Sequence, residues 1–287
     1  MTTVIIPAHN ESTSIRPSLS SIVTQTDHED LLIVVANGCS DDTAQVAKNF
    51  HSRIQVIETP IPSKIIALNI GESLSSGFPR IYADADIIFS PGTIDRIKAA
   101  LSSGEKLAVS PDPMMDLSQS SWAVKAYYDV WLSMPYCRQG MIGAGVYALS
   151  EEGRKRFDKF PDVIADDGYV RALFKEHERG KVEGAYVTVK APANLKWLMK
   201  IKTRSRLGQM QLAMLYPELM ANETKDYSGG IFQVLKNPMN WPKAAVYLYV
   251  TILSRILAKQ KLKNIEGYRW EKDLSSRQNA QGQEVQS

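Results

Sequence analysis

The fold of this chain is decided by the stretch Arg80-Ile81-Tyr82-Ala83-Asp84-Ala85-Asp86-Ile87, in which a short apolar run stops at two carboxylates one residue apart. We predict a β-strand that ends at this pair. Side chains two apart on a strand share one side, and open parallel sheets bind ligands at the carboxyl ends of their strands. Two hard oxygen ligands there suit Mg²⁺ or Mn²⁺ holding a diphosphate. The pair is equally typical of a turn and helix N-cap after a strand, so the motif alone leaves both interpretations open.

Three earlier segments repeat the same order of an apolar strand followed by a helical stretch. The predicted strands begin at Thr3, Leu31 and Arg53, and the predicted helices cover residues 12–23, 41–50 and 64–71. Alternation of this kind predicts a parallel sheet with crossover helices. The carboxyl ends of the strands would then line one crevice.

Four motifs stand along this pattern in a fixed order. They are Pro7-Ala8-His9-Asn10-Glu11, Asn37-Gly38-Cys39-Ser40-Asp41-Asp42-Thr43, Lys64 with Ala67-Leu68-Asn69 and Gly71, and Asp84-Ala85-Asp86. In this order and spacing the set resembles glycosyltransferase family 2, whose members use nucleotide sugars. The resemblance covers about the first 215 residues. It implies the GT-A fold, an α/β architecture with a Rossmann-like, mostly parallel sheet flanked by helices, here with a C-terminal helical appendage.

The resemblance also suggests a domain organisation. We predict a catalytic domain over residues 1–215, with a donor-binding half at about 1–111 and an acceptor-binding half at about 112–215. A helical segment that can associate with membranes is expected over residues 216–275. Residues 276–287 are Gln-rich and nearly devoid of large apolar side chains, which predicts a disordered tail.

Composition narrows the classes of partner. The chain has 287 residues, of which 44% are hydrophobic, enough for a substantial core. Residues 1–189 carry 18 Lys and Arg against 24 Asp and Glu, whereas residues 190–287 carry 16 against 7. An acidic first part and a basic second part argue against general nucleic-acid binding and favour an anionic surface or ligand near the C-terminus.

Two cysteines, Cys39 and Cys137, form neither a disulfide framework nor a metal-binding spacing, which is typical of a reducing compartment. The N-terminus enters a predicted strand at Thr3 without a basic region and an apolar core of a signal peptide. We therefore expect a cytoplasmic protein, with peripheral contact to the inner face of the cell membrane left open.

The resemblance assigns the turn after the first strand to the donor nucleoside, through Pro7, Ala8, Asn10 and Glu11. Glu11 is the expected acceptor for the ribose hydroxyls, because a carboxylate can accept hydrogen bonds from neighbouring hydroxyl groups. The alternative is that Asn10 and Glu11 only cap the following helix.

The second strand departs from the pattern of the family, in which aspartates precede the glycine. Ala36 and Asn37 occupy those positions here, so Asn37 would read the base with an amide, and UDP is the expected donor nucleotide. Asp41 and Asp42 stand at the start of a helix, where capping is the favoured role. Lys64 either approaches the donor or is an ordinary surface lysine.

The carboxylate pair has a definite task in this family. Departure of a nucleoside diphosphate develops negative charge, which a divalent cation stabilises. Asp86 is the expected direct ligand of Mn²⁺ or Mg²⁺, and Asp84 is expected at the ribose or at a metal-bound water.

The acceptor side is predicted downstream. A short strand at 107–110 precedes a loop that contains Asp112 and Asp116, and a helical region follows with Trp122 and Trp131. Aromatic faces at this spacing either stack on sugar rings or pack in the core.

Small residues and a second acidic pair complete the predicted site. The segment Gly143-Ala144-Gly145 resembles the part of the family that lines the sugar and acceptor pocket, where small residues let backbone approach a ligand. Asp166 and Asp167 precede a helix predicted over 169–178. The resemblance makes Asp167 the general base that takes the proton of the acceptor hydroxyl, with Asp166 beside it. A simple helix N-cap is the alternative.

The basic stretch 200–209 includes Arg204 and Arg206, which by the same resemblance would face the donor diphosphate, since guanidinium groups suit phosphate oxygens. A solvated basic face is the alternative. The sequence lacks the Gln and Arg-Trp signature of processive synthases, so we expect one sugar per encounter.

The apolar run 244–258 is too short to span a bilayer comfortably and is interrupted by Arg255. One interpretation is an amphipathic helix on an anionic membrane, supported by a basic flank and by the aromatic residues Trp241, Tyr247, Tyr249 and Trp270. The other is a helix buried against the catalytic domain or against another copy of the chain.

The sequence therefore predicts an inverting, metal-dependent glycosyltransferase that adds a sugar to a lipid-linked or polysaccharide precursor. A nucleotidyltransferase is disfavoured because the basic glycine-rich loop that grips a triphosphate is missing. A dehydrogenase is disfavoured because no Gly-x-Gly-x-x-Gly motif follows the first strand. A non-catalytic nucleotide-sugar-binding or membrane scaffold protein of the same fold remains the alternative.

Overall fold

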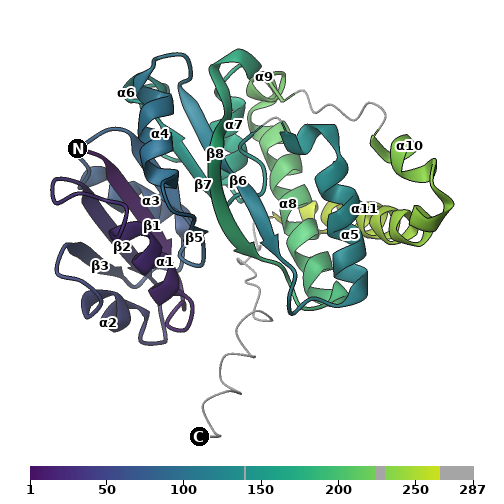
Figure 1. Ribbon diagram of the computed structural model, residues 1–287, viewed down its shortest axis with the longest axis horizontal. Helices are drawn as coiled ribbons and strands as arrows, with labels where there is room; N and C mark the ends of the chain where they lie inside the picture. Colours follow the sequence, from purple (N-terminus) through teal and green to yellow (C-terminus); the bar gives the residue numbers. More distant parts are fainter. Residues whose placement is uncertain (139, 224–229, 266–287) are drawn as a thin grey trace, which may run out of the picture. The chain divides into compact units, whose positions relative to one another are not determined.

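The computed structural model describes residues 1–138, 140–223 and 230–265, and the chain divides into two compact units (Figure 1). Unit 1 combines residues 1–114, 140–162 and 173–189, and unit 2 combines residues 115–139, 163–172 and the chain from 190 onward. Trp270 and the predicted disordered tail at 276–287 lie outside the described residues. The predicted domain boundary at 215 stays a prediction.

Within the described residues, unit 1 holds an eight-stranded sheet in the order β3-β2-β1-β4-β7-β6-β8-β5. The strands are β1 Thr3–Ala8, β2 Leu31–Asn37, β3 Ile54–Thr59, β4 Arg80–Ala83, β5 Ile88–Phe89, β6 Ala108–Asp116, β7 Val146–Leu149 and β8 Arg179–Lys190. Strands β3, β2, β1 and β4 pair in parallel, and β7 joins β4 in antiparallel orientation. The predicted α/β architecture with a mostly parallel sheet is confirmed, and antiparallel pairs join β7 to β4 and β6, and β5 to β8.

The register brings the strand ends together. Thr3 of β1 aligns with Leu31 of β2 and with Arg80 of β4. Because parallel strands that start level also end at one edge, the turns after β1, β2 and β4 share the carboxyl edge of the sheet. This edge carries the first, second and fourth sequence motifs.

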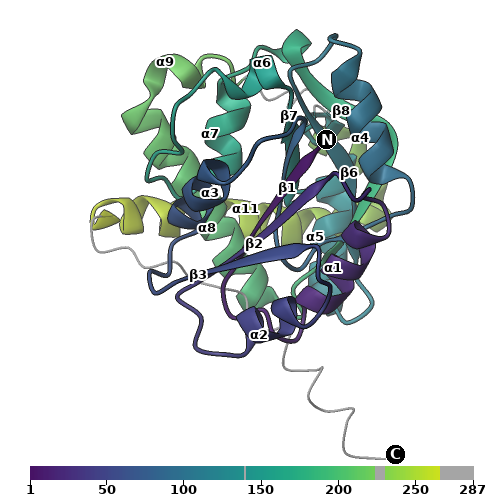
Figure 2. The same ribbon diagram turned by 90° about the vertical axis from the view of Figure 1, so that its left-hand side faces the viewer.

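Helices cover both faces of the parallel strands. In unit 1 they are α1 Ile15–Val23, α2 Thr43–Lys48, α3 Lys64–Ser73, α4 Thr93–Ser102, α6 Glu151–Arg154 and the 3₁₀ helix η2 Glu176–Glu178. Successive side chains of β2 point to opposite faces of the sheet. Leu32 and Val34 pack with residues of α1 and α4 on one face, whereas Ile33 and Val35 pack with Ala67 of α3 on the other. Figure 2 shows α1 and α3 on opposite sides of β1 and β2.

The close approach of α3 to β1 depends on Gly71. A Cβ atom at this position would lie 2.4 Å from Cγ2 of Ile5, a fully buried residue of β1. The glycine of the third motif is therefore required by packing, although glycine weakens a helix interior.

Two predicted boundaries are wrong. Strand β6 continues to Asp116 through the predicted loop, because it lies beside β8 in the sheet and Asp112 forms an ion pair with Lys181 of β8. Helix α7 covers Asp166–Ala172 and not residues 169–178, of which 176–178 form η2. At β6 the pairing with β8 outweighs the local sequence pattern.

Unit 2 is helical. Its elements are α5 Trp122–Ser133, the 3₁₀ helix η1 Pro135–Arg138, α7, α8 Leu195–Leu215, α9 Pro217–Met220, α10 Gly230–Leu235, the 3₁₀ helix η3 Pro238–Asn240 and α11 Trp241–Leu262. Helix α11 packs against α8 and α5 and buries Tyr247, whose ring stacks on Tyr127 with centroids 5.4 Å apart. One face of the predicted C-terminal helix is therefore part of the core of unit 2. None of the described helices has the length and apolar character needed to cross a bilayer.

A lysine lies within this helical core. The Lys202 ammonium of α8 lies 4.3 Å from the ring centroid of Trp131, and 5.1 Å and 5.2 Å from those of Tyr127 and Tyr128. Burial lowers the pKa of Lys202 to about 8; Cys137 opposes this shift and Arg206 adds to it. Aromatic faces attract the ammonium, but they do not replace its hydration.

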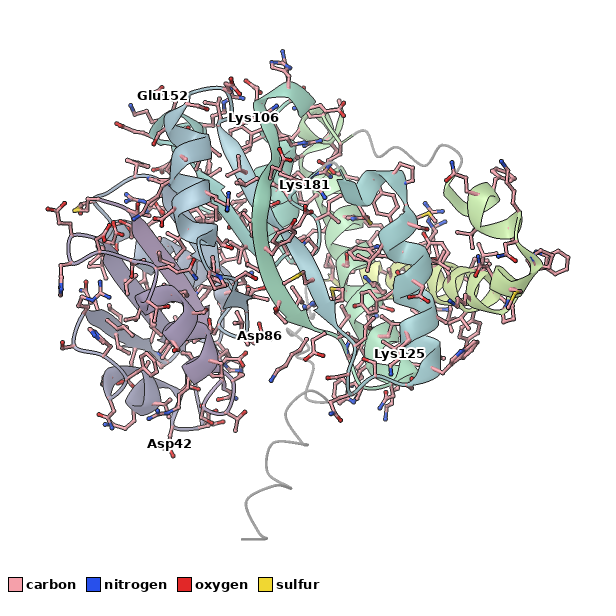
Figure 3. All side chains as sticks on the ribbon, in the orientation of Figure 1. Asp42, Asp86, Lys106, Lys125, Glu152 and Lys181 are labelled. Carbon is pink, nitrogen blue, oxygen red and sulfur yellow. The ribbon has the colours of Figure 1, made fainter. Side chains whose placement is uncertain are left out.

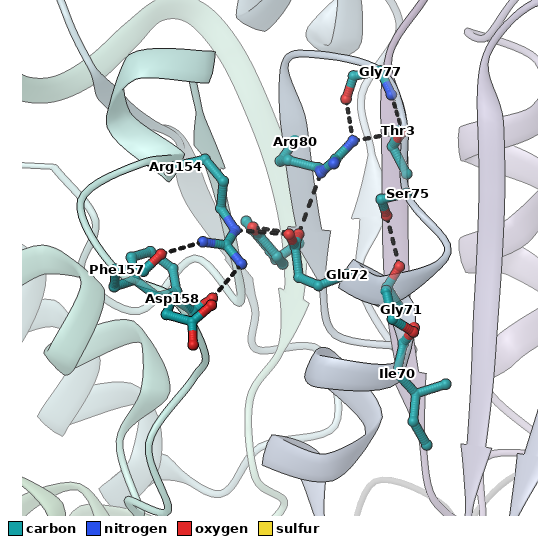
Figure 4. A network of polar contacts seen from close by, with 12 residues as sticks. Thr3, Ile70, Gly71, Glu72, Ser75, Gly77, Arg80, Arg154, Phe157 and Asp158 are labelled. Carbon is teal, nitrogen blue, oxygen red and sulfur yellow. Dashed lines mark hydrogen bonds and ion pairs between the residues drawn. The ribbon is translucent and has the colours of Figure 1, made fainter.

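Unit 1 contains a buried ionic network centred on Glu72 of α3 (Figure 4). The carboxylate accepts hydrogen bonds from Tyr82 Oη at 2.7 Å and Arg154 Nε at 2.7 Å, and Arg80 Nε lies at 3.3 Å. Burial and the Glu72 carboxylate raise the pKa of Tyr82 well above its usual range. The network ties α3, β4 and α6 together.

We expect Glu72→Gln to lower the free energy of unfolding by about 3 kcal/mol, because it leaves the buried guanidinium of Arg80 and the partly buried guanidinium of Arg154 without their counter-charge. The matched control is Glu58→Gln, since Glu58 pairs with Lys48 through side chains that are 59% and 46% exposed. That pair contributes at most about 1 kcal/mol. Urea denaturation of both variants measures the difference, and equal losses would contradict a structural role for the network.

The lowered pKa of Lys202 predicts a pH dependence of stability. Between about pH 8 and the ordinary lysine value of 10.5, the unfolded chain holds a proton that the folded chain has released. Stability contributed by this group therefore rises with pH across that window. In Lys202→Met this rise should be absent, whereas the exposed Lys200→Met should keep it. Urea denaturation between about pH 7.5 and about pH 10 tests this, and parallel profiles for all three proteins would contradict it.

Candidate active site

The turns after β1 and β2 are locked to each other by side-chain contacts. Asn10 adopts a positive φ of 53°, which Asn tolerates, and its Oδ1 accepts a hydrogen bond from the Ser40 amide at 2.7 Å. Asp41 Oδ2 accepts from the Ser12 amide at 3.1 Å. The first two motifs therefore form one polar rim at the carboxyl edge of the sheet.

Asp41 and Thr43 also link the turn after β2 to Glu11, and we call these contacts, together with those of Asn10, the clamp. Asp41 Oδ1 accepts from the amide and the hydroxyl of Thr43 at 3.1 Å and 2.5 Å, and Thr43 Oγ1 accepts from the Glu11 amide at 2.6 Å. Burial by itself raises the pKa of Asp41, but the hydrogen bonds from Thr43 and Ser12 outweigh it and lower the pKa. Asp41 thus has the predicted capping role at α2. Asp42 is the exposed N-cap residue, without a side-chain hydrogen bond to the helix among the described residues.

Glu11 is buried and belongs to the start of α1. Its carbonyl accepts hydrogen bonds from the amides of Ser14 and Ile15 at 3.0 Å and 2.9 Å, and its carboxylate accepts from Ser14 Oγ. These contacts match the alternative interpretation, in which Glu11 caps the helix. Contact with a ribose stays a prediction.

Asn37 is buried at the end of β2. Its Nδ2 donates to the Ala8 carbonyl at 2.9 Å, and its own carbonyl lies 2.6 Å from Nδ1 of His9. The amide nitrogen therefore joins the ends of β1 and β2, so contact with a base would use Oδ1. Pro7 and Ala8 are buried residues of β1 that pair with Val35 and Ala36.

The carboxylate pair follows β4 directly, at the predicted position. Asp84 is the first residue after the strand, its amide donates to the Gly145 carbonyl at 2.9 Å, and Asp86 lies in the following turn, partly exposed. Figure 3 shows Asp86 toward the lower end of the strands. Lys64, the first residue of α3, places its Nζ 2.7 Å from Asp84 Oδ1. The sequence left open whether Lys64 approaches the donor or lies on the surface, and in the structure its side chain points to Asp84.

Gly145 lets the backbone pass close to this pair. It has a φ of +62°, and a Cβ atom there would lie 2.9 Å from Cδ1 of Ile87 and 3.1 Å from Asp84 Oδ2. Gly143 also has a positive φ of 70°, and Ala144 between them is buried. The predicted segment of small residues thus borders the carboxylate pair through Gly145.

A divalent cation fits this donor set. In the described parts of the chain, no cluster of three or more His, Cys, Asp or Glu side chains could hold a metal ion. Proteins usually bind Mg²⁺ together with substrate phosphates through one or two carboxylates, and the phosphates supply further oxygen ligands. Asp84 and Asp86 therefore suit a cation that arrives with a diphosphate.

The second acidic pair lies in unit 2, at the start of α7. Asp166 is 4% exposed, whereas Asp167 is exposed and its Oδ1 accepts from the Gly168 amide at 2.8 Å. Solvent can reach Asp167, so of the two it is the one able to meet an incoming hydroxyl group.

The other predicted residues of unit 2 differ in exposure. Trp122 is 59% exposed, whereas Trp131 is 7% exposed and its ring lies beneath Lys202. Core packing, the alternative interpretation, thus describes Trp131. Arg204 and Arg206 are partly exposed on α8, and Arg206 Nη1 lies 3.4 Å from Gln209 Oε1.

Sequence reasoning missed two connections in unit 1. The bond from the Glu11 amide to Thr43 and the pair between Lys64 and Asp84 both join motifs that lie far apart in sequence. The available signal was topological, because helices that follow parallel strands begin at the edge where those strands end.

The first half of the chain is similar in sequence to known glycosyltransferases. The family described as glycosyl transferase family 2 matches residues 3–141. The uncharacterized glycosyltransferase YibD of Escherichia coli (strain K12) is 22% identical over 143 residues, which are 49% of this chain and 40% of that protein. The chain thus matches less than half of the length of this curated relative.

Solved structures share the fold. Mannosyltransferase PcManGT from Pyrobaculum calidifontis, in complex with GDP-Man and Mn²⁺, has a TM-score of 0.62 at 18% identity, covering 98% of this chain and 79% of that one. Glucosyl-3-phosphoglycerate synthase from Mycobacterium tuberculosis, in complex with Mn²⁺, UDP and glucosyl-3-phosphoglycerate, has a TM-score of 0.53 at 21% identity, covering 75% and 79%. S. aureus TarS 1-349 with UDP has a TM-score of 0.53 at 11% identity, covering 94% of each chain. With its motifs on the carboxyl edge of such a sheet, the chain has the GT-A fold of these glycosyltransferases, and its residues 3–141 match glycosyl transferase family 2.

Proposed function

We propose that the chain is an inverting, divalent-metal-dependent glycosyltransferase that moves a sugar from a nucleotide sugar to a hydroxyl group of a lipid-linked or polysaccharide precursor. The observation that carries the proposal is the placement of Asp84, Asp86 and Lys64 together at the carboxyl edge of a GT-A sheet. Charges of both signs at this edge suit a diphosphate and its cation.

A UDP-sugar is the proposed donor. Two of the structural neighbours above are complexes with UDP and one is a complex with GDP-Man, so the fold accommodates either base. In this chain Asn37 would offer Oδ1 to the base, and the clamped turn of Asn10 and Glu11 would hold the nucleoside. Asp84 and Asp86 would hold Mn²⁺ or Mg²⁺, which when bound supplies positive charge against the departing diphosphate.

The transfer step needs a base and cationic support. Asp167 would take the proton of the acceptor hydroxyl as that oxygen attacks the anomeric carbon, and its exposure allows the encounter. Arg204 and Arg206 would bind diphosphate oxygens. A single displacement of this kind inverts the anomeric centre without a covalent sugar–enzyme intermediate.

The deciding assay incubates the full chain with a panel of nucleotide sugars and Mn²⁺ and measures the nucleoside diphosphate released. Release that requires an acceptor supports transfer, and slow release without one indicates donor hydrolysis. No release from any donor would favour the non-catalytic alternative.

We expect Asp86→Asn to abolish metal-dependent transfer, and Asp167→Asn to reduce transfer about 10²- to 10⁴-fold while donor binding is kept. Asp42→Asn is the matched control, since this exposed carboxylate lies at the start of α2 and makes no cap contact among the described residues. Initial rates and nucleotide titrations measure both effects. Transfer at the wild-type rate in either variant would remove that residue from the mechanism.

We further propose peripheral contact with an anionic membrane through α11. The face of this helix that points away from α5 and α8 carries Tyr249, Ile252 and Ile256, which are 54%, 57% and 48% exposed. Lys259 and Lys261 follow in its last turn. An apolar stripe beside cations is typical of helices that lie on anionic lipid headgroups.

Replacement of Ile252 and Ile256 by serine should weaken binding to vesicles that contain phosphatidylglycerol, because it removes apolar area from the exposed stripe. Point changes are preferred to deletion of the segment, since the other face of α11 is part of the unit 2 core. The control is Met214→Ser, an equally exposed apolar residue on α8. Co-sedimentation measures binding, and equal retention of all three proteins would refute the membrane assignment.

A further inference from the structure

The ion pair between Lys64 and Asp84 places a cation on a carboxylate that the proposed function assigns to metal binding. Nζ of Lys64 lies 2.7 Å from Asp84 Oδ1, and the two side chains are 28% and 41% exposed. Lys64 begins α3, which Ser63 caps by accepting the Ile66 amide at 3.3 Å. The lysine therefore extends from a fixed helix end.

The Asp84 carboxylate lies between Lys64 and the backbone of Gly145. The amide of Asp84 is bonded to the Gly145 carbonyl at 2.9 Å, and the other carboxylate oxygen, Oδ2, lies against Gly145, only 3.1 Å from the position that a Cβ would take. An ammonium so close to Oδ1 and a divalent cation on the same carboxylate would repel each other. Each cation therefore weakens the binding of the other to this carboxylate.

On the basis of the proposed function, we propose that Lys64 acts as the counter-ion of Asp84 when no ligand is bound. Binding of metal and nucleotide together displaces Lys64 from this carboxylate. The diphosphate of the donor offers the ammonium a more highly charged partner. The long, flexible lysine side chain, with three donors, can reach a new acceptor without movement of α3. The donor thereby frees Asp84 for the cation that it brings.

This exchange couples the two binding steps. Lys64 opposes binding of metal alone, and the diphosphate removes that opposition, so nucleotide raises metal affinity and metal raises nucleotide affinity by the same factor. An ion pair with a purely structural role, which only ties α3 to the end of β4, would leave metal affinity and coupling unchanged when its charge is removed.

The test measures Mn²⁺ binding to the purified full chain, through the electron paramagnetic resonance signal of free Mn²⁺, with and without UDP or GDP. Without nucleotide, Lys64→Gln should bind Mn²⁺ about fivefold more tightly than wild type, the upper range for a partly exposed ion pair. The factor by which nucleotide tightens Mn²⁺ binding should fall at least as much. Lys64→Arg, which keeps the charge, should retain the coupling.

Controls separate this inference from the function on which it rests. Lys98→Gln removes a lysine that pairs with Asp30 at 2.7 Å and should leave Mn²⁺ binding unchanged. Lys64→Met provides a second neutral variant, and circular dichroism verifies that each variant folds. Unchanged Mn²⁺ affinity and coupling in both neutral variants would overturn the inference, even where Asp86→Asn abolishes Mn²⁺ binding. Equal Mn²⁺ binding by wild type and Asp86→Asn would overturn the proposed metal site itself.

Discussion

The carboxyl edge of the sheet in unit 1 depends on the parallel pairing of β1 with β2 and β4. Level registers end these strands at one edge, so residues that are more than 70 positions apart in sequence, from Glu11 to Asp84, come to border the same side of the sheet. Backbone hydrogen bonds between the strands hold this arrangement, and the buried side chains of β1, β2 and β4 specify its register. The polar turns then add the clamp of Asn10, Asp41 and Thr43.

The ion pairs at the edge of the sheet in unit 1 are more exposed to solvent than those in its interior. The Glu72 side chain is only 10% exposed and pairs with Arg80 and Arg154. Asp84 and Lys64 remain partly exposed, where water and ligands can compete for them. A buried network of this kind serves stability, whereas an exposed pair of opposite charges can exchange partners at low cost.

The aromatic residues of α5 and the cations of α8 lie close together in unit 2. The rings of α5 enclose the Lys202 ammonium and stack on Tyr247, so most of them belong to the core. The next cations of α8, Arg204 and Arg206, stay partly exposed. Arg206 lies four residues after Lys202, on the same face of α8, where its charge helps to lower the pKa of Lys202, whereas Arg204 lies on a different side of the helix.

The sequence by itself determined the α/β core with its parallel strands, the match of residues 3–141 to glycosyl transferase family 2 and the place of the carboxylate pair after β4, because strand–helix alternation and motif order are local properties of the chain. It did not determine the extension of β6 to Asp116 or the burial of Trp131. Only the tertiary structure decided that Lys64 pairs with Asp84 and that Gly71 and Gly145 are required by close packing. The physical reason is that these contacts join segments distant in sequence, and no local pattern of residue types specifies which partner a side chain will meet in space.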